Sequence, residues 1–238
     1  MSTMKTIYFN IQSKGGAGKS MLTYFQALKH EKNTKSCFVD LDSSTKTSTQ
    51  QLKFLHEQGR LFEIDIYDNL KKIEREKLFD VLDVLSQTSF EEIFIDFGAP
   101  ESEQLPSLFN IDFTIDEFKE FEASLDLKFV FNVIMAGGPA YIPCFGYLKT
   151  IVQLAGGHFE TWCYINEHTF SGHAEFMEEI TQFAKLTKGN LQVKGFGNIQ
   201  TDRSSGQAII GYITQGKGFQ DYQTFTSRTI MKRELAKL

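Results

Sequence analysis

The sequence predicts an α/β fold: one doubly wound, mainly parallel β-sheet with helices on both faces, built by residues 1–238 as a single domain. Short apolar segments alternate along the chain with amphipathic segments of helical period, which is the pattern of successive βαβ units. A glycine-rich turn lies between the first such strand and the first such helix. With 238 residues, 41% of them hydrophobic and 23% charged, the chain can bury one full core and is neither disordered nor collagen-like.

The elements follow one another in a regular order. Strands are predicted at 6–11, 36–41, 61–67, 93–96, 128–135 and 159–165, with a short strand after residue 191. Helices are predicted from the glycine-rich turn to about residue 30, at 70–85, 101–109, 115–124, 141–154 and 172–186, and in the tail. Residues 61–67 alternate apolar and polar side chains, which is typical of an edge or half-buried strand. Strands separated by helices are joined by right-handed crossovers, so the sheet is expected to be mainly parallel.

The glycine-rich turn has the sequence Ser13-Lys-Gly-Gly-Ala-Gly-Lys-Ser20 and predicts a phosphate-binding loop. Its glycines have no Cβ, so the backbone can wrap closely around phosphate oxygens and point N–H groups at them. The following helix adds the positive end of its dipole. Lys19 supplies a charge for the β- and γ-phosphates, and the Ser20 hydroxyl can ligate Mg²⁺. The strict GxxxxGK[ST] pattern is not met, because Ser13 stands at its first position and Lys14 follows.

With Lys14 at its start, the loop resembles the deviant Walker A motif of the ParA/MinD ATPases. Three further segments occur in the family's order. Residues 37–42 resemble the family's apolar strand that ends in DxD, and 93–96 resemble its Walker B strand. Asn166 closes a late strand where the family often has an asparagine that recognises adenine. The resemblance spans about residues 5–166.

This resemblance implies a Mg²⁺- and ATP-dependent dimerising ATPase that alternates between ATP and ADP. It implies catalytic roles for Lys14, Lys19 and Asp42: Lys14 reaches the phosphates of a partner subunit, and Asp42 orients the attacking water. Nucleotide-binding positions are then Gly15, Gly16, Ala17, Gly18, Lys19, Ser20, Met21 and Asn166, and metal-binding positions are Ser20, Asp40 and Asp96. Each of these aspartates, and Asn166, also has a plainer interpretation, as a residue that caps or begins a turn at a strand end.

The sequence departs from the partition ATPases at two places. Residues 43–45 (SST) follow Asp42 where most of those proteins have Pro-Gln, and Phe97-Gly98 follows Asp96 where they usually have Thr or Leu and then Pro. Residues 97–100 and 136–140, together with Asn166, are similar to ATPases encoded by plasmid conjugation and mobilisation genes. Plasmid transfer or partition through an unidentified protein partner is therefore the expected process. Two alternatives stay open: a nucleotide-binding assembly module with little hydrolysis, and a small-molecule ligase or kinase.

Charge and cysteine content bear on the surroundings of the protein. Three cysteines without CxxC spacing favour a reduced, cytoplasmic protein. The longest apolar stretch, 129–136, is far shorter than the ~20 residues of a membrane span, so no stable membrane insertion is expected. The net charge is −5, yet the last 22 residues hold five basic and two acidic side chains. The favoured interpretation is a packed helix whose basic face is in water, with weak DNA contact as the alternative.

Overall fold

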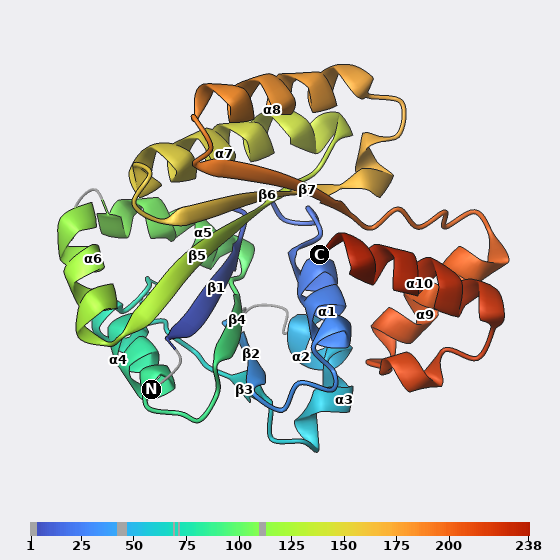
Figure 1. The fold of residues 1–238 in the computed structure, drawn as a ribbon, viewed down its shortest axis with the longest axis horizontal. Coiled ribbons are helices and arrows are strands. Elements are labelled where there is room, and N and C mark those ends of the chain that lie inside the picture. The colour runs from blue at the N-terminus through green and yellow to red at the C-terminus, as the bar shows by residue number, and fades with distance from the viewer. Residues whose placement is uncertain (1–3, 42–46, 69, 71, 110–112) are drawn as a thin grey trace.

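Seven parallel strands form one sheet in the order β3-β2-β4-β1-β5-β6-β7 (Figure 1). The computed structural model describes residues 4–41, 47–68, 70, 72–109 and 113–238. The strands are β1 (Lys5–Ile11), β2 (Ser36–Asp40), β3 (Leu61–Glu63), β4 (Glu92–Asp96), β5 (Leu127–Met135), β6 (Glu160–Asn166) and β7 (Leu191–Phe196). The α/β fold class and the parallel sheet predicted from the sequence are confirmed.

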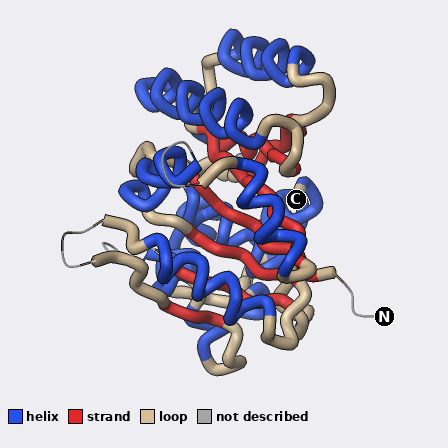
Figure 2. Tube along the Cα trace, turned by 90° about the vertical axis from the view of Figure 1, so that its left-hand side faces the viewer, coloured by secondary structure: helices blue, strands red, loops and turns tan. Residues whose placement is uncertain are grey.

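Helices cover both faces of this sheet, as Figure 1 shows, and the view turned by 90° shows the strands as a twisted layer among them (Figure 2). One side has α1 (Lys19–Lys29), α2 (Thr47–Gln51), α3 (Lys53–His56), α9 (Ser204–Thr214) and α10 (Phe225–Lys237). The other side has α4 (Arg75–Ser86), α5 (Ala99–Ser107), α6 (Ile115–Ser124), α7 (Tyr141–Ala155) and α8 (Ala174–Leu186). Short 3-10 turns are η2 (Gly138–Ala140), η3 (Glu167–Phe170) and η4 (Phe219–Asp221).

Aromatic side chains fill the core on the side of α4–α8. Phe9 of β1 stacks on Phe131 of β5 with ring centroids 5.3 Å apart, and Phe118 of α6 stacks on Phe129 at 4.7 Å. All four side chains are at least 96% buried. Such ring pairs stabilise the packing beyond the area they bury, which accounts for much of the high phenylalanine content.

Two element boundaries differ from those predicted. The edge strand β3 ends at Glu63, four residues before the predicted end, and an antiparallel bridge between Tyr67 and Ile73 follows. The Asp68 side chain accepts hydrogen bonds from the main-chain N–H groups of Leu70 and Lys72. These local bonds compete with helical ones, so α4 begins at Arg75 rather than at residue 70.

The tail forms a helix that packs against α1, α9 and β7. Met231 is fully buried, whereas Lys232 and Arg233 are exposed. Lys237 pairs with Glu167 at 2.7 Å and with Glu234 at 2.9 Å. The packed-helix interpretation of the tail is confirmed. Within the described residues, none of the helices combines the length and the apolar character that crossing a membrane requires.

Candidate functional site

The glycine-rich loop joins the carboxyl end of β1 to the first turn of α1. Gly16 and Gly18 have φ angles of +75° and +108°, which glycine adopts without strain. A Cβ built on Gly15 or Gly16 would meet no atom within 4 Å, so this part of the loop borders open space. The N-cap position of α1 is Gly18, which has no side chain to bond the first N–H groups of the helix. The loop therefore presents main-chain donors to a pocket, as phosphate binding requires.

Lys19 lies against the start of the same loop. Its side chain is only 8% exposed, and its Nζ donates to the main-chain oxygen of Gln12 at 2.9 Å. The Gln12 side chain donates to the carbonyl of Ile134 at 2.6 Å and accepts from the main-chain N–H of Lys14 at 3.1 Å. Gln12 thus fixes the loop to β5, and it is a residue that sequence reasoning missed.

Asp96, at the end of β4, is the acidic centre of the site. Its Oδ2 accepts from the Ser20 hydroxyl at 2.9 Å and also from the hydroxyl of Ser48. Its Oδ1 is buried and has no hydrogen-bond partner among the described residues. Burial raises the pKa of this carboxyl to about 7. The hydrogen bonds from the two serine hydroxyls lower the pKa, but by less than burial raises it. A carboxylate oxygen without a partner, next to a serine hydroxyl, fits the hard oxygen donors that Mg²⁺ prefers.

Asp40 is the cross-strand neighbour of Asp96 in the register of β2 and β4. Its Oδ2 accepts from the main-chain N–H of Thr49 at 2.7 Å and from the Thr49 hydroxyl at 2.8 Å. Asp40 therefore holds α2 against the site. This agrees with the plainer interpretation of Asp40 as a residue that binds a turn at a strand end. The charge of Asp40 also raises the pKa of Asp96. A metal-binding role for Asp40 stays a prediction. Asp42 lies outside the described residues.

These elements surround a pocket of about 370 Å³. It is lined by Gly15, Gly16, Ala17, Gly18, Lys19, Ser20 and Met21, all predicted, and by Thr47, Gln51, Ala99 and Pro100. The last four, together with Ser48 and Thr49, were not predicted as site residues. Helix α2 is short and polar, so no hydrophobic period indicates it, and only the Ser/Thr-rich run around it gave a signal.

Four predicted residues of the described part lie beside this pocket rather than in its lining: Asp40 and Asp96, already described, and Lys14 and Asn166. Lys14 is exposed, and among the described residues its side chain makes no hydrogen bond or ion pair. Asn166 is 95% buried and its Nδ2 donates to the main-chain oxygen of Ala17 at 3.1 Å. The Oδ1 of Asn166 is buried without a partner in the described part of the chain. Asn166 thus supports the loop and keeps one acceptor free.

Comparisons with known proteins bear on the fold. Neither a family model nor a curated protein matches the sequence. A chain of the MinC:MinD cell division protein complex of Aquifex aeolicus superposes with a TM-score of 0.52 at 12% identity, covering 98% of this chain and 94% of that one. MinD of the same organism gives 0.49 at 12% identity and 98% coverage of both chains. A plasmid partition protein from Borrelia burgdorferi gives 0.48 at 14% identity, covering 89% and 96%. The first of these similarities shows that this chain shares the α/β fold of a chain in the MinC:MinD complex.

Proposed function

We propose that this protein is a Mg²⁺-dependent ATPase that acts as a dimerising switch of the ParA/MinD kind. The strongest support for this proposal is that the glycine-rich loop lies next to the carboxylate of Asp96. The glycine-rich loop turns its main chain towards a pocket, and Ser20 of the same loop is bonded to the buried Asp96. A loop of N–H donors beside a lysine and a Ser–Asp pair suits a triphosphate with its magnesium ion.

The predicted site residues have separate roles in this proposal. Lys19 exchanges its bond to the Gln12 carbonyl for the β- and γ-phosphates, and the loop N–H groups bind the phosphate oxygens. Ser20 and Asp96, with Asp40 behind them, hold Mg²⁺, which neutralises charge on the phosphates when it is bound. The free Oδ1 of Asn166, near Met21, is the acceptor that would favour adenine.

Hydrolysis in this proposal needs two subunits. Lys14 is exposed outside its own pocket, which suits a lysine that serves the phosphates of a second copy across a homodimer. Asp42 orients the attacking water. Hydrolysis to ADP then releases the dimer.

Calorimetry with ATP and Mg²⁺ tests the nucleotide site. Lys19→Ala is expected to abolish measurable binding, because the variant loses the charge that faces the phosphates. Lys14→Ala is the matched control and is expected to retain ATP binding, because its side chain lies outside the pocket lining. Unchanged binding by Lys19→Ala would contradict the assigned site.

One alternative within this fold is a module that binds nucleotide without appreciable hydrolysis. It is favoured by the segment after Asp96, where Phe97 is fully buried and brings no polar group to the pocket. Turnover measured for the wild type and for Asp42→Ala separates the two proposals. A wild type that is as inert as the variant supports the module, and a variant that loses a measurable turnover supports the ATPase.

We assign the switch to plasmid transfer or partition, acting through a protein partner in the cytoplasm. Its three cysteines are free and buried, which suits a reducing compartment. Exposed basic residues of α10, among them Lys232 and Arg233, are available for weak DNA contact. Neighbouring relaxase or coupling-protein genes would support transfer, and a neighbouring gene for a centromere-binding protein would support partition.

A further inference from the structure

Buried side-chain oxygens without a hydrogen-bond partner gather near the carboxyl ends of the strands. In the described part of the chain they include Oε1 of Gln51, Oδ1 of Asp96 and Oδ1 of Asn166. Asp96 and Asn166 end strands β4 and β6, and Gln51 ends helix α2, which follows β2. Buried polar atoms are nearly always bonded, so these oxygens indicate where bonds to a ligand form. Asp96 and Asn166 already have roles in the proposed site, but Gln51 has none.

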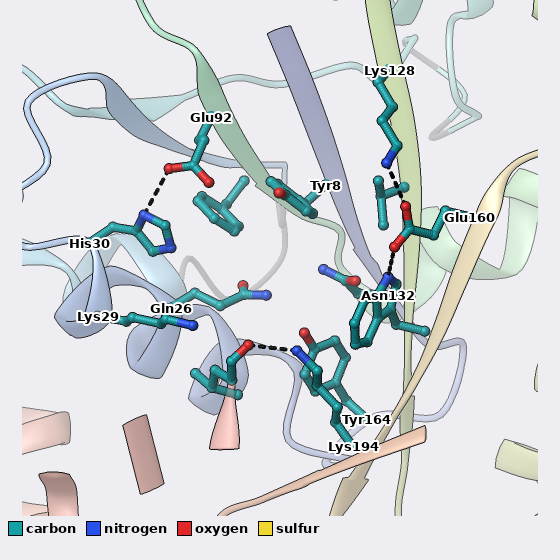
Figure 3. A pocket seen from close by; sticks show the side chains of 14 residues that line it. Tyr8, Gln26, Lys29, His30, Glu92, Lys128, Asn132, Glu160, Tyr164 and Lys194 are labelled. Carbon is teal, nitrogen blue, oxygen red and sulfur yellow. Dashed lines mark hydrogen bonds and ion pairs between the residues drawn. The ribbon is translucent and has the colours of Figure 1, made fainter. Parts of the chain in front are cut away.

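The polar groups at the opposite end of the sheet are satisfied within the chain. A cavity of about 220 Å³ lies there between α1 and the amino ends of β4, β5 and β6, and Figure 3 shows its acidic side chains paired with basic ones. Glu92 pairs with His30 at 3.0 Å, and Glu160 pairs with Lys128 at 2.5 Å. The residues that line this cavity all belong to the described part, and none has a buried side-chain oxygen or nitrogen without a partner.

Gln51 lines the pocket of the glycine-rich loop from the side of α2. The first turn of α2 is fixed to the acidic centre, because the Ser48 hydroxyl donates to Asp96 and the main-chain N–H of Thr49 donates to Asp40 at 2.7 Å. Side chains three residues apart lie on the same face of a helix, so Gln51 shares the face of Ser48. Gln51 therefore lies about one helical turn along α2 from the serine that bonds Asp96.

The strand order places Gln51 at the phosphate end of the proposed site. In the sheet, β2 and β4 lie on one side of β1, and β5 and β6 lie on the other. Gln51 on the helix after β2 and Asn166 at the end of β6 therefore flank the loop from opposite sides. Because the proposed function assigns Asn166 to the base and Asp96 to the metal, Gln51 lies near the metal and the γ-phosphate.

The Oε1 atom of Gln51 is an acceptor, which limits what it can bond there. The oxygens of a triphosphate are also acceptors, so the phosphates offer it no donor. Water offers two O–H groups. The segment after Asp96 supplies no competing side-chain acceptor, because Phe97 is buried and apolar and the lining residues Ala99 and Pro100 have no polar side chain. Gln51 is therefore suited to bond a water molecule beside the γ-phosphate.

We propose that Gln51 orients the water that attacks the γ-phosphate, an inference that rests on the proposed ATPase function. Oε1 of Gln51 accepts one O–H group of this water, and the carboxylate of Asp42 accepts the other. The water oxygen forms a bond to the γ-phosphorus. The bond from the γ-phosphorus to the bridging oxygen breaks, and its electron pair stays on ADP. An amide takes up no proton, so both water protons end on the released phosphate, H₂PO₄⁻.

Turnover at saturating ATP and Mg²⁺ tests this role, with the neighbouring glutamine as the matched control. Gln51→Met keeps the length of the side chain but removes the amide, and should lower kcat about 100-fold, a usual effect of losing a group that handles the reacting water. Its ATP affinity, measured by calorimetry, should stay within about twofold, because the lost bond is made to water and not to the nucleotide. Gln50→Met changes an exposed side chain outside the pocket lining and should keep the wild-type kcat.

A second variant separates an accepting role from a structural one. Gln51→Glu keeps an acceptor oxygen at the same distance from the main chain, so its kcat should exceed that of Gln51→Met by about tenfold or more. Gln51 is only half-buried, so both variants should fold. Calorimetry with and without EDTA should show the wild-type Mg²⁺ effect in Gln51→Met, because the bonded water is not a metal ligand.

Four results would overturn the role of Gln51. These are a wild-type kcat in Gln51→Met, a loss of ATP affinity as large as the loss of kcat, a Gln51→Glu variant as slow as Gln51→Met, and a Gln51→Met variant without the Mg²⁺ effect. A wild type without measurable turnover contradicts the proposed ATPase and this inference together. A wild type that hydrolyses ATP no faster than Gln51→Met overturns the role of Gln51 and leaves the ATPase standing.

Discussion

Gly18 is the residue whose replacement has the clearest steric consequence in the loop. Its φ is +108°, and a Cβ at this position would lie 2.7 Å from the Nδ2 of Asn166. At Gly15, three residues earlier, a Cβ would meet no atom within 4 Å, and the φ angle is not positive. The fold therefore requires glycine at position 18 but not at position 15, although both are glycines of the same sequence motif.

Gly18→Ala is accordingly expected to lower the free energy of unfolding by about 1–3 kcal/mol, the usual cost of a strained backbone conformation. Gly15→Ala should keep or slightly raise it, because it restricts the unfolded chain without a clash. Thermal unfolding of the two variants beside the wild type measures the difference. Equal unfolding temperatures for the two variants would show that the Gly18 conformation is not needed.

Asp96 is the residue on which metal binding in the proposed site depends. Asp96→Asn keeps the shape and the bonds to Ser20 and Ser48 but removes the negative charge. Because burial of that charge is costly, the fold should tolerate the amide well. We expect ATP to bind this variant with the same affinity in Mg²⁺ and in EDTA, whereas Mg²⁺ tightens binding to the wild type.

Calorimetry with and without EDTA provides that measurement. The matched control is Asp202→Asn, an exposed carboxylate away from the pocket, which should retain the Mg²⁺ effect of the wild type. A Mg²⁺ effect that survives in Asp96→Asn would assign the metal to other ligands.

Among the elements, α1 is tied to the tail by two tyrosines. The Tyr24 hydroxyl donates to the main-chain oxygen of Lys217 at 2.6 Å and lies 3.0 Å from the Tyr222 hydroxyl. Burial raises the pKa of both phenols above the usual value. In the unfolded chain a tyrosine titrates near pH ~10.

The folded state therefore keeps two protons that the unfolded chain loses at high pH. By linkage, the free energy of unfolding is undiminished below pH ~10 and falls as the pH rises above it. Tyr222→Phe should cost about 1 kcal/mol at pH 7, for one lost hydrogen bond, and should make the alkaline decline shallower. Denaturant unfolding at pH 7 and at higher pH measures the loss of stability and the alkaline decline. An equally steep decline in the variant would contradict the raised pKa of Tyr222.

The elements that sequence reasoning predicted well are those whose cause is local. The glycine-rich loop, α1 and the buried strands follow from contiguous residue types, so their positions were predicted nearly to the residue. Helices α2, α3 and α9 were not predicted. The residues of α2 (TSTQQ) have no apolar period, and the helix is held by the bonds between Asp40 and Thr49, which only the tertiary structure creates.

The same distinction applies to the site. Lys19, Ser20 and Asp96 lie in recognisable local motifs and meet as predicted. Gln12 and Ser48 reach the site through contacts to distant segments. The local sequence of Gln12 does not indicate this role, and for Ser48 the Ser/Thr-rich run around it is the one local signal. The support of the loop by Asn166 is likewise a product of the fold, since 149 residues separate Asn166 from Ala17.

At the scale of the whole molecule, the carboxyl edge of the sheet gathers the glycine-rich loop, Asp40, Asp96 and Asn166. Ligand sites in open α/β sheets form at this edge because loops from several strands meet there. Lys14 lies at the same edge with its side chain exposed and outside the pocket lining. In the proposed dimer a second pocket approaches this edge, and Lys14 contacts the phosphates bound there.

Lys14→Ala is therefore expected to separate nucleotide binding from self-association. Light scattering with Mg²⁺ and a saturating non-hydrolysable ATP analogue should give a dimer for the wild type and a monomer for Lys14→Ala, although both bind the analogue. Lys19→Ala should stay monomeric because it binds no nucleotide, and Lys188→Ala, an exposed lysine away from the pocket, should dimerise. The reason is electrostatic: two triphosphates brought together repel each other unless a cation from each partner lies between them. A wild type that remains monomeric at saturation, or a Lys14→Ala variant that dimerises as well as the wild type, would exclude this role of Lys14.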